Sequence, residues 1–464
     1  MKPARRSVHP KRSGAVLIIS MIFLVVFSTL ALSAATLSGT NLQVAENQRK
    51  ADSARACAES GLEVVRFWLN RVSISGTTAP SQRLNEIASS LQSELSDDGI
   101  TNITTYHDGS TIDIPSVTLN SDSAQSFSAT ITRISDDTLQ VDVTGTYGSI
   151  TRTIRVNYNF GTRANTVFDF GVATKGPLSL SGNIELDGVN ISVESNAYIE
   201  SENSILALSI IGNSQIAGDV NIVNPIATVD LQGGKAGIGG ETGQDAIDNH
   251  VQFGAPPTEF PAPNPELFEP YATHIVDSST DTSADATLEN VRVLAGTNPT
   301  FSGHVTLKGV VFIETPNIVR FTGTADLTAI VVGNGDWTDN SATNQISFLG
   351  DVQSLPVSAL PCTEQFAGLH DQTGTFVMAP GFHVSLGGSF TTLSGAIVAN
   401  GIEFFGNAGG IINGSIINYS DQEMSLGGNN DLYFNRSGTA QVPAGFVPEI
   451  VLHYNPTSYT EITS

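Results

Sequence analysis

The apolar and polar positions of this chain follow four successive patterns: an apolar run, a helical stripe, a two-residue alternation and a glycine-punctuated repeat. The apolar run, Ala15 to Leu32, lies within residues 13–45, which carry no charged side chain. About 20 helical residues rise roughly 30 Å, the thickness of a bilayer core. We therefore predict a transmembrane helix over residues 15–35, after a basic leader at residues 1–14.

The leader fixes the expected orientation of this helix. Its five basic residues are Lys2, Arg5, Arg6, Lys11 and Arg12. Basic residues beside a span are retained on the cytoplasmic side. We expect a single-pass protein of the cytoplasmic membrane with its N-terminus in the cytoplasm. The bulk of the chain is then periplasmic or at the cell surface.

Helical periodicity continues beyond the apolar run. Between Asn41 and Arg71, small and apolar residues recur every three or four positions and charged residues lie between them. This pattern predicts a soluble amphipathic continuation of the helix over residues 36–72. Small residues allow a second helix or a sheet to approach closely. We expect such contact along a stripe formed by Ala51, Ala54, Ala58, Gly61 and Leu62.

Residues 73–163 predict a small α+β segment. A short amphipathic helix is expected from Arg83 to Leu95, after a linker. Apolar and polar residues then alternate through residues 126–134, 138–147 and 150–160, with turn residues between them. Such alternation is typical of antiparallel strands joined by hairpins.

Residues 164–464 repeat a glycine pattern. Pairs of glycines six apart, flanked by alternating apolar residues, occur at Gly182 and Gly188, Gly212 and Gly218, and Gly303 and Gly309. A further copy begins at Gly323 and has Ala329 in the second position. The repeat predicts a parallel right-handed β-helix, or solenoid, in which glycines form tight corners. An antiparallel sandwich is the alternative.

A proline-rich stretch at residues 256–270 interrupts the repeat. Prolines cannot donate ladder hydrogen bonds, so this stretch cannot form central strands. We expect an extended excursion whose aromatic residues pack along the solenoid. An interdomain hinge is the second interpretation.

The N-terminal region resembles a known family. The basic leader, Gly14 before an apolar helix, and the segment Ala54-Arg-Ala-Cys-Ala-Glu-Ser-Gly-Leu-Glu-Val-Val65 are similar to the PilX-type N-terminal region of minor-pilin-like proteins of type IV pilus assembly. The resemblance covers about residues 10–75. It implies that a prepilin peptidase cuts between Gly14 and Ala15.

Two positions depart from the pilin pattern. Ile19 stands where major pilins carry a glutamate, and the residue after the cut is Ala15 rather than phenylalanine. An uncleaved anchor remains an alternative, as does a signal peptide cut near Ser33-Ala34-Ala35.

Charge and cysteine content exclude some classes of function. The chain carries 21 basic and 45 acidic residues, a formal net charge of −24. Nucleic-acid binding is not expected, because phosphate contacts require clustered lysine and arginine. The two cysteines, Cys57 and Cys362, are most simply separate thiols, although a bridge between them stays open.

Candidate chemistry in the C-terminal region is sparse. Only six basic residues follow Asn165, and no paired carboxylates are apparent, so we expect no enzyme and no cofactor. Two acidic loops, with Asp277, Asp281 and Asp285 in one and Asp336, Asp339 and Asn340 in the other, lack the spacing of known calcium loops, and we expect solvated acids there. The glycine-rich run at 233–240 is expected to be a flexible corner, and Trp337 a packing residue or a sugar platform.

The resemblance gives the expected function. It implies a non-enzymatic, minor-pilin-like structural component of a type IV pilus or secretion filament, with other pilin-like subunits and the assembly machinery as partners. The solenoid would be displayed outside, with a surface glycan as a further candidate partner. The alternative is a membrane-anchored adhesin or glycan-binding β-helix unrelated to pili.

Overall fold

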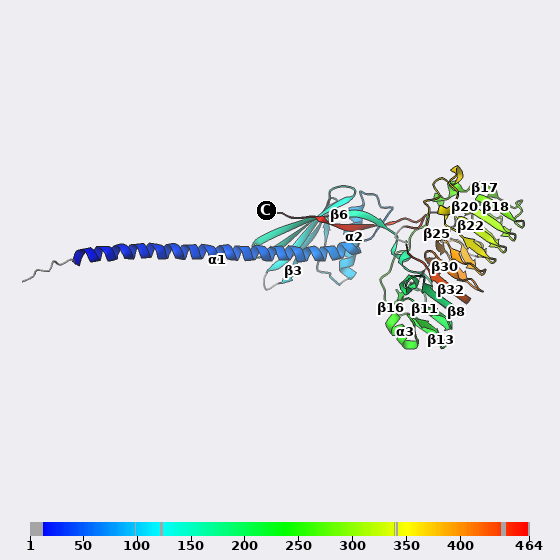
Figure 1. The fold of residues 1–464 in the computed structure, drawn as a ribbon, viewed down its shortest axis with the longest axis horizontal. Helices are drawn as coiled ribbons and strands as arrows, with labels where there is room; N and C mark the ends of the chain where they lie inside the picture. The colour runs from blue at the N-terminus through cyan, green and yellow to red at the C-terminus, as the bar shows by residue number, and fades with distance from the viewer. Residues whose placement is uncertain are drawn as a thin grey trace, which may run out of the picture. The chain divides into compact units, whose positions relative to one another are not determined.

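The computed structural model describes residues 13–97, 99–120, 124–337, 339, 342–437 and 442–462. These residues form two compact units (Figure 1). Unit 1 comprises residues 1–74, 78–161 and 451–464, and unit 2 comprises residues 75–77 and 162–450. Unit 2 is therefore an insertion between two strands of unit 1.

Unit 1 consists of a long helix, a short helix and an antiparallel sheet. The long helix α1 spans Ser13–Arg71, and α2 spans Arg83–Asp97. The sheet has the order β1-β33-β6-β5-β4-β3-β2. Its strands are β1 Ile74–Ser75, β2 Tyr106–His107, β3 Thr111–Asn120, β4 Gln125–Arg133, β5 Thr138–Tyr147, β6 Ile150–Arg163 and β33 Glu449–Ile462.

The two-residue alternation explains how this sheet packs. Pairing of β5 with β6 is antiparallel and sets Val141 against Val156 and Val143 against Ile154. These side chains are buried and lie on the face toward α1, whereas the intervening residues are only partly buried. The three strands predicted from alternation are confirmed, with ends that differ by at most three residues.

Unit 2 is built from two large parallel sheets. The first has twelve strands: β7 Val172–Thr174, β9 Ala197–Ile199, β12 Val220–Ile222, β16 Val251–Phe253, β17 His274–Val276, β18 Ala286–Val293, β20 Val305–Ile313, β22 Ala325–Gly333, β24 Val352–Ser354, β25 Thr375–Ala379, β28 Ala396–Ala399 and β31 Ile416–Asn418. From β20 to β32, consecutive strands alternate largely between the two sheets.

The second sheet has fourteen strands. They are β8 Leu178–Gly188, β10 Leu206–Gly212, β11 Gln215–Ile216, β13 Thr228–Gln232, β14 Gly237–Ile238, β15 Glu241–Thr242, β19 Thr300–Phe301, β21 Ile318–Phe321, β23 Gln345–Phe348, β26 His383–Leu386, β27 Thr392–Leu393, β29 Ile402–Phe404, β30 Gly410–Ile412 and β32 Met424–Phe434. Among the described strands of this sheet, β14 and β15 alone pair antiparallel, at its edge. The remaining helices are α3 Gly243–His250 and short 3-10 turns η1 Thr166–Asp169, η2 Ser192–Ser195, η3 Pro265–Leu267, η4 Glu269–Tyr271, η5 Val357–Ala359 and η6 Glu364–Phe366.

The glycine repeat sets the register of these strands. Gly182 pairs with Gly212, and Gly309 pairs with Ala329, as the repeat predicted. Gly182 has a positive φ of 118°, and a Cβ there would meet the carbonyl oxygen of Gly428 on the neighbouring strand. Only glycine fits such a corner, because the backbones approach without room for a side chain.

The order of strands in the sheet differs from their order in the chain. The twelve-stranded sheet runs β16-β12-β9-β7-β31-β28-β25-β22-β20-β18-β17. The chain therefore enters in the middle at β7, proceeds to one edge at β16, resumes at the opposite edge at β17 and returns to lie beside β7. The glycine repeat predicts a stack of strands but does not specify this order.

The proline-rich segment links the two edges of this sheet. Residues 254–273 connect β16 to β17, and eleven strands spaced about 4.8 Å apart span roughly 48 Å. Six of these residues form the 3-10 turns η3 and η4, which rise about 2.0 Å per residue, and the others extend at about 3.1 Å each, so the segment can reach roughly 55 Å. The segment lies within unit 2 and is not a hinge between the units.

This segment also buries the outer face of the twelve-stranded sheet. Strand β20 sends Val311 into the inner core of unit 2 and Val310 and Phe312 into an outer core. Phe260 and Phe268 of the proline-rich segment belong to the outer core. Strands buried on both faces have continuous apolar sequences, which explains runs such as Gly309-Val-Val-Phe-Ile313.

One boundary differs from that expected. The predicted C-terminal domain extends to residue 464, but residues 451–464 belong to unit 1 because β33 pairs with β6. The glycine-rich run at 233–240, expected to be a flexible corner, contains the short strand β14 and is followed closely by α3.

Candidate functional site

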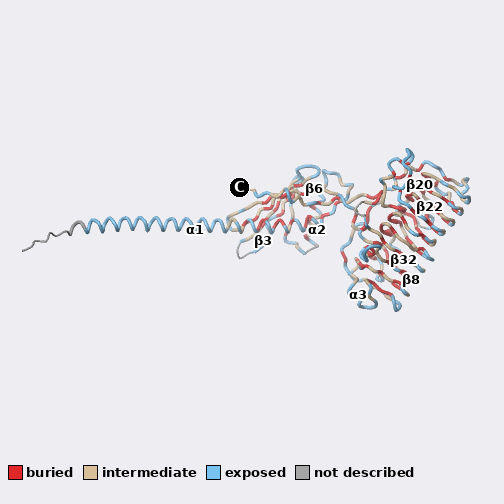
Figure 2. The backbone as a smooth tube through the Cα atoms, viewed as in Figure 1, coloured by how far each residue is buried: buried red, intermediate tan, exposed pale blue. Residues whose placement is uncertain are grey.

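The site that the structure builds most fully in unit 1 is α1 together with the sheet beneath its second half. The first half, from Val16 to Val44, is exposed on all sides within the structure (Figure 2). An 18-residue window in it has a mean hydropathy of 2.6, and none of that window is buried. The segment is therefore a candidate membrane anchor, since an apolar surface around a whole helix suits lipid.

Several hydroxyl groups in this half donate hydrogen bonds to carbonyl oxygens of the same helix. Ser28 Oγ donates to the carbonyl oxygen of Leu24 at 2.7 Å, and Thr29 Oγ1 donates to that of Val26 at 2.9 Å. Ser20 and Thr36 make equivalent bonds to the preceding turn. Such bonds allow polar side chains to lie in hydrocarbon without leaving a donor unpaired.

The second half of α1 packs its small-residue stripe against β5 and β4. Ala54 and Ala58 are fully buried, Leu62 is nearly so, and Ala51 is half-buried at the edge of the contact. The helix can lie this close because β5 carries Gly145 at the point of contact. A Cβ on Gly145 would meet the backbone of Ala54 and Ala58.

A second glycine makes a reciprocal contact. A Cβ on Gly61 would lie 2.5–2.7 Å from the Phe127 side chain, so this ring fills the space that the missing side chain leaves. Phe127 is only 1% exposed. The stripe thus meets the chain's own sheet at two glycines, one on each partner.

Gly145 and Phe127 were not among the residues predicted from the sequence. A signal for Gly145 was present, because it continues the inward positions Leu139, Val141 and Val143 in steps of two. A glycine at an inward position of a strand indicates close approach of another backbone. Phe127 carries no such signal, because any large apolar residue suits its position.

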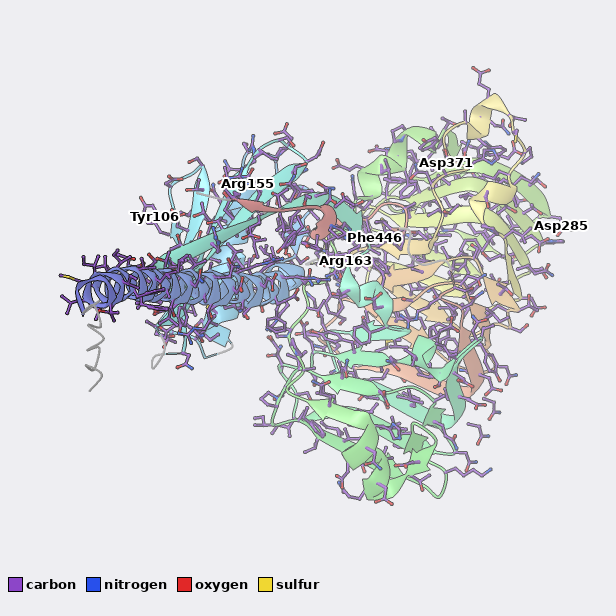
Figure 3. The ribbon with its side chains drawn as sticks, turned by 60° about the vertical axis from the view of Figure 1, so that its left-hand side comes forward. Tyr106, Arg155, Arg163, Asp285, Asp371 and Phe446 are labelled. Atoms are coloured by element: carbon purple, nitrogen blue, oxygen red, sulfur yellow. The ribbon has the colours of Figure 1, made fainter. Side chains whose placement is uncertain are left out.

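Charged residues lie beside the stripe and pair with one another. Lys50 contacts Glu46 at 2.9 Å, and Arg55 contacts Glu59 at 3.1 Å, both one helical turn apart. On the sheet, Arg155, which is labelled in Figure 3, donates two hydrogen bonds of 2.7 and 2.6 Å to Asp142. These bonds raise the pKa of Arg155.

Two buried groups in unit 1 have shifted pKa values. Burial raises the pKa of the Cys57 thiol, although a backbone hydrogen bond from Ser126 opposes this shift. Burial also raises the pKa of the Tyr158 hydroxyl. Cys57 is buried in unit 1 and Cys362 is exposed in unit 2, and both thiols are free.

The predicted cleavage site lies at the start of α1. The backbone of Gly14 and Ala15 is helical, and these positions immediately precede the candidate anchor. The residues before Ser13, including the basic leader, lie outside the described part of the chain. Cleavage between Gly14 and Ala15 therefore stays a prediction.

Carboxylates of the first acidic loop of unit 2 accept hydrogen bonds from backbone N–H groups and serine hydroxyl groups. Asp277 Oδ1 accepts hydrogen bonds from Ser279, which lower the pKa of its carboxyl group, and Asp281 Oδ1 accepts from Ser283 in the same way. Asp285 accepts from the backbone of His304. Asn340 lies outside the described residues. Among the described histidine, cysteine and acidic residues, no group of three is placed to hold a metal ion.

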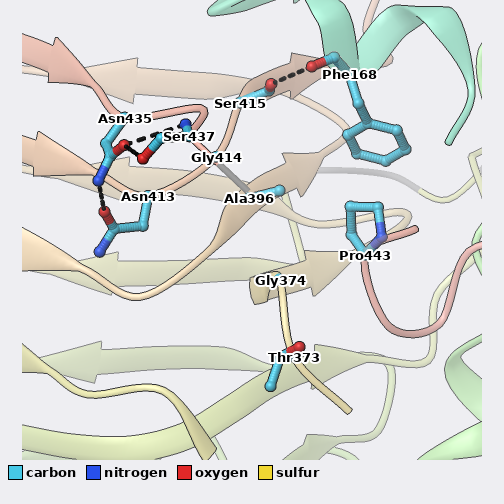
Figure 4. A pocket seen from close by; sticks show the side chains of 10 residues that line it. All are labelled: Phe168, Thr373, Gly374, Ala396, Asn413, Gly414, Ser415, Asn435, Ser437 and Pro443. Carbon is cyan, nitrogen blue, oxygen red and sulfur yellow. Dashed lines mark hydrogen bonds between the residues drawn. The ribbon is translucent and has the colours of Figure 1, made fainter. Parts of the chain in front are cut away.

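A cavity of about 220 Å³ in unit 2 is lined by polar side chains that bind one another (Figure 4). Asn435 Nδ2 donates to Asn413 Oδ1 at 3.0 Å, and Ser437 Oγ donates to Asn435 Oδ1 at 2.6 Å. The Phe168 ring and Pro443 line another part of the wall. None of the ten described lining residues is ionisable, so these residues offer no general acid or base.

Comparison with known proteins finds likeness at the N-terminus and to solved structures, among them a pilin and an ice-binding protein. The PilX N-terminal family matches residues 13–63, which shows a pilin-like N-terminal region. No curated protein matches the sequence. The competence-associated pilin ComZ from Thermus thermophilus is similar at 10% identity and a TM-score of 0.23, over 89% of this chain and 97% of that chain.

The second structure is an ice-binding protein from the Antarctic ascomycete Antarctomyces psychrotrophicus. It is similar at 13% identity and a TM-score of 0.18, over 57% of this chain and 94% of that chain. At such scores neither likeness bears on the fold or the function of this chain.

Proposed function

We propose that this chain, whose N-terminal region is pilin-like, is a minor-pilin-like structural component of a type IV pilus or a related secretion filament. One observation carries the proposal. The residues that the PilX N-terminal family matches are those that join the exposed apolar half of α1 to the stripe packed on the sheet. A helix that is apolar all round at one end and docked at the other suits lateral packing with equivalent helices.

The two halves of α1 have different tasks in this proposal. The apolar half spans the cytoplasmic membrane with its N-terminus in the cytoplasm, and it packs against neighbouring pilin-like helices. The stripe is already covered by β5 and β4, so its task is to hold the sheet on the helix. The bulk of the chain lies outside the membrane.

Unit 2 is proposed to be a right-handed β-helix that the filament displays. Parallel pairing in both sheets supports this interpretation, as do consecutive strands that alternate between them. Its role is proposed to be structural rather than enzymatic.

The test is the N-terminal residue of the mature protein, measured by mass spectrometry of membrane and sheared-filament fractions. We expect Ala15 at the N-terminus and co-purification with pilin subunits. A Gly14→Leu variant is the control. It should retain Met1 and be absent from the filament fraction. An intact Met1 in the unaltered protein would contradict pilin processing, and a start near Thr36 would indicate a secreted protein.

The alternative function is a membrane-anchored adhesin or glycan-binding protein unrelated to pili. The observation that favours it is Ile19, which stands where major pilins carry a glutamate. This alternative predicts an uncleaved anchor and no co-purification with pilin subunits. The same fractionation therefore separates the two functions.

A further inference from the structure

A second cavity in unit 2, of about 340 Å³, lies at the outer face of the twelve-stranded sheet. Trp337 lines it, together with Phe312 of β20 and Pro263 and Pro265 of the proline-rich segment. Three carboxylate residues, Glu266, Glu269 and Asp336, also line it. It thus combines an aromatic surface with negative charge. The described wall of the 220 Å³ cavity has an aromatic residue but no charged one.

The indole of Trp337 is fixed in orientation by the residues around it. Its ring stacks on Tyr419 with centroids 3.8 Å apart and planes inclined by 10°. Tyr419 is buried, contacts Phe260 edge-on at 5.3 Å and donates its hydroxyl proton to the carbonyl oxygen of Pro261. The backbone oxygen of Trp337 accepts a hydrogen bond of 2.9 Å from Asn400. The indole is therefore preorganised while remaining partly exposed.

The charge around this cavity is negative. Arg292 contacts Glu269 at 2.9 Å and Glu314 at 2.7 Å, so its one positive charge faces two carboxylates. Glu266 and Asp336 add further negative charge at the wall. A cation entering the cavity gains electrostatic attraction, whereas an anion is repelled.

The aromatic residues beside this cavity already bind cations from the chain itself. Lys175 Nζ lies 5.2 Å from the Phe260 ring centroid and 5.7 Å from that of Tyr419. The guanidinium of Arg292 lies 5.7 Å from the ring centroid of Phe312. Tryptophan attracts a cation more strongly than either tyrosine or phenylalanine. Trp337 is thus the strongest such ring of the cluster, and it borders the open cavity together with Phe312.

We propose that the cavity at Trp337 binds an organic ammonium group, with the indole contacting its apolar part and Glu266 and Asp336 facing its charge. The group can be carried by an amino sugar or by a choline-type headgroup. This site does not depend on whether the chain enters a filament, so its test is separate from that of the proposed function.

Binding is tested on the purified full-length chain in detergent by tryptophan fluorescence. The chain has two tryptophans, and Trp68→Phe leaves Trp337 as the only reporter. The probes are a glucosamine oligomer, its N-acetylated counterpart, which lacks the charge, and choline. We expect the glucosamine oligomer or choline to change the fluorescence saturably, with affinity that falls as salt rises, and the N-acetylated oligomer to have no effect.

Two variants decide the assignment by calorimetry in the unaltered background. We expect Trp337→Ala to weaken binding about tenfold or more and Glu266→Gln to weaken it several-fold. Glu364→Gln, an exposed carboxylate outside the cavity, is the matched control and should leave affinity unchanged. Equal binding of the N-acetylated oligomer would overturn the ammonium assignment. Failure of all three probes, or unchanged affinity in Glu266→Gln, would overturn the site.

Discussion

At the scale of single residues, two glycines set the distance between α1 and its sheet. Gly145 on β5 leaves room for the backbone of Ala54 and Ala58, and Gly61 on α1 leaves room for Phe127. In each case the space is taken by a well-buried neighbour. Neither glycine adopts a positive φ, so each is required for close approach rather than for backbone conformation.

Gly61→Leu should destabilise unit 1, because the added side chain and the Phe127 ring compete for the same space. Overpacking of this kind typically costs about 1–3 kcal/mol. Chemical denaturation of the purified chain, followed by a probe in unit 1, measures the loss.

Phe127→Ala in the same chain should restore part of that stability, since it empties the space that the larger side chain at position 61 needs. The double variant is then more stable than the sum of the two single changes predicts. Additive effects would show that positions 61 and 127 do not share this space. Gly39→Ala is the control, because a Cβ at Gly39 meets no atom within 4 Å.

Glu194 illustrates a buried charge that hydrogen bonds stabilise. Burial by itself would raise the pKa of its carboxyl group. The carboxylate accepts hydrogen bonds of 2.8 and 3.0 Å from Asn190. It also accepts one of 3.1 Å from the backbone N–H of Arg436. Together, such bonds lower the pKa of the carboxyl group below its usual value. Arg436 lies on the segment after β32, so the carboxylate joins two distant parts of unit 2.

The stability of unit 2 should therefore depend on pH in the acid range. A carboxyl group with a lowered folded-state pKa contributes stability above its unfolded-state pKa, near 4.5, and loses it as pH falls through the folded-state value. Glu194→Gln should flatten this dependence, as measured by denaturant midpoints from neutral pH downward. The exposed Glu364→Gln should not. An unchanged slope in Glu194→Gln would contradict the assignment.

At the scale of elements, the proline-rich segment is a structural part of unit 2. It follows the outer face of the twelve-stranded sheet: Thr258 binds Tyr198 of β9, Pro261 binds Tyr419 after β31, and Glu269 reaches Arg292 on β18. Its prolines keep the backbone extended and remove donors that the sheet face cannot satisfy. The segment therefore covers a surface that would otherwise be apolar and exposed.

Phe268→Ala should destabilise unit 2 strongly. Phe268 is fully buried in the outer core, and truncation of a buried phenylalanine to alanine typically costs about 3–5 kcal/mol. Phe253→Ala is the matched control, since that ring is 37% exposed and a much smaller loss is expected. Equal losses, measured by denaturant titration, would show that the segment does not carry the outer core.

At the scale of the whole molecule, the chain leaves unit 1 through β6 and returns through β33. The two connections are tied together inside unit 2, because Glu449 contacts Arg163 at 3.0 Å and Asn165 at 2.7 Å. The ends of unit 2 thus lie next to each other, which is the usual condition for a tolerated domain insertion. The sheet of unit 1 is completed only by residues that follow unit 2 in the chain.

This arrangement predicts opposite results for two deletions. Replacing residues 164–448 by a short flexible linker should leave unit 1 folded, because β6 and β33 can still pair. Ending the chain at residue 450 should unfold unit 1, because the sheet loses most of β33. This deletion removes fewer residues than the replacement of residues 164–448. Hydrogen exchange of β5 measures both outcomes, and protection of β5 in the chain that ends at residue 450 would contradict the role of β33.

The sequence alone determined the elements whose signal is local. Local patterns of neighbouring residues predict four features: the apolar run, the stripe, the alternating strands and the glycine repeat. Each follows from helical or two-residue periodicity. The register of Gly309 with Ala329 could be predicted because the two copies are adjacent in the chain and in the sheet.

Only the tertiary structure decided which distant segments meet. Asn183 and Asn429 pair across 246 residues on neighbouring strands, and β33 completes a sheet that begins before unit 2. Parallel strands with similar apolar patterns cannot be matched to their partners from sequence alone. The entropy of loop closure and the burial of apolar surface determine which strands pair. The cavity at Trp337 arises in the same way, because its aromatic and acidic residues come from three separate segments that only folding brings together.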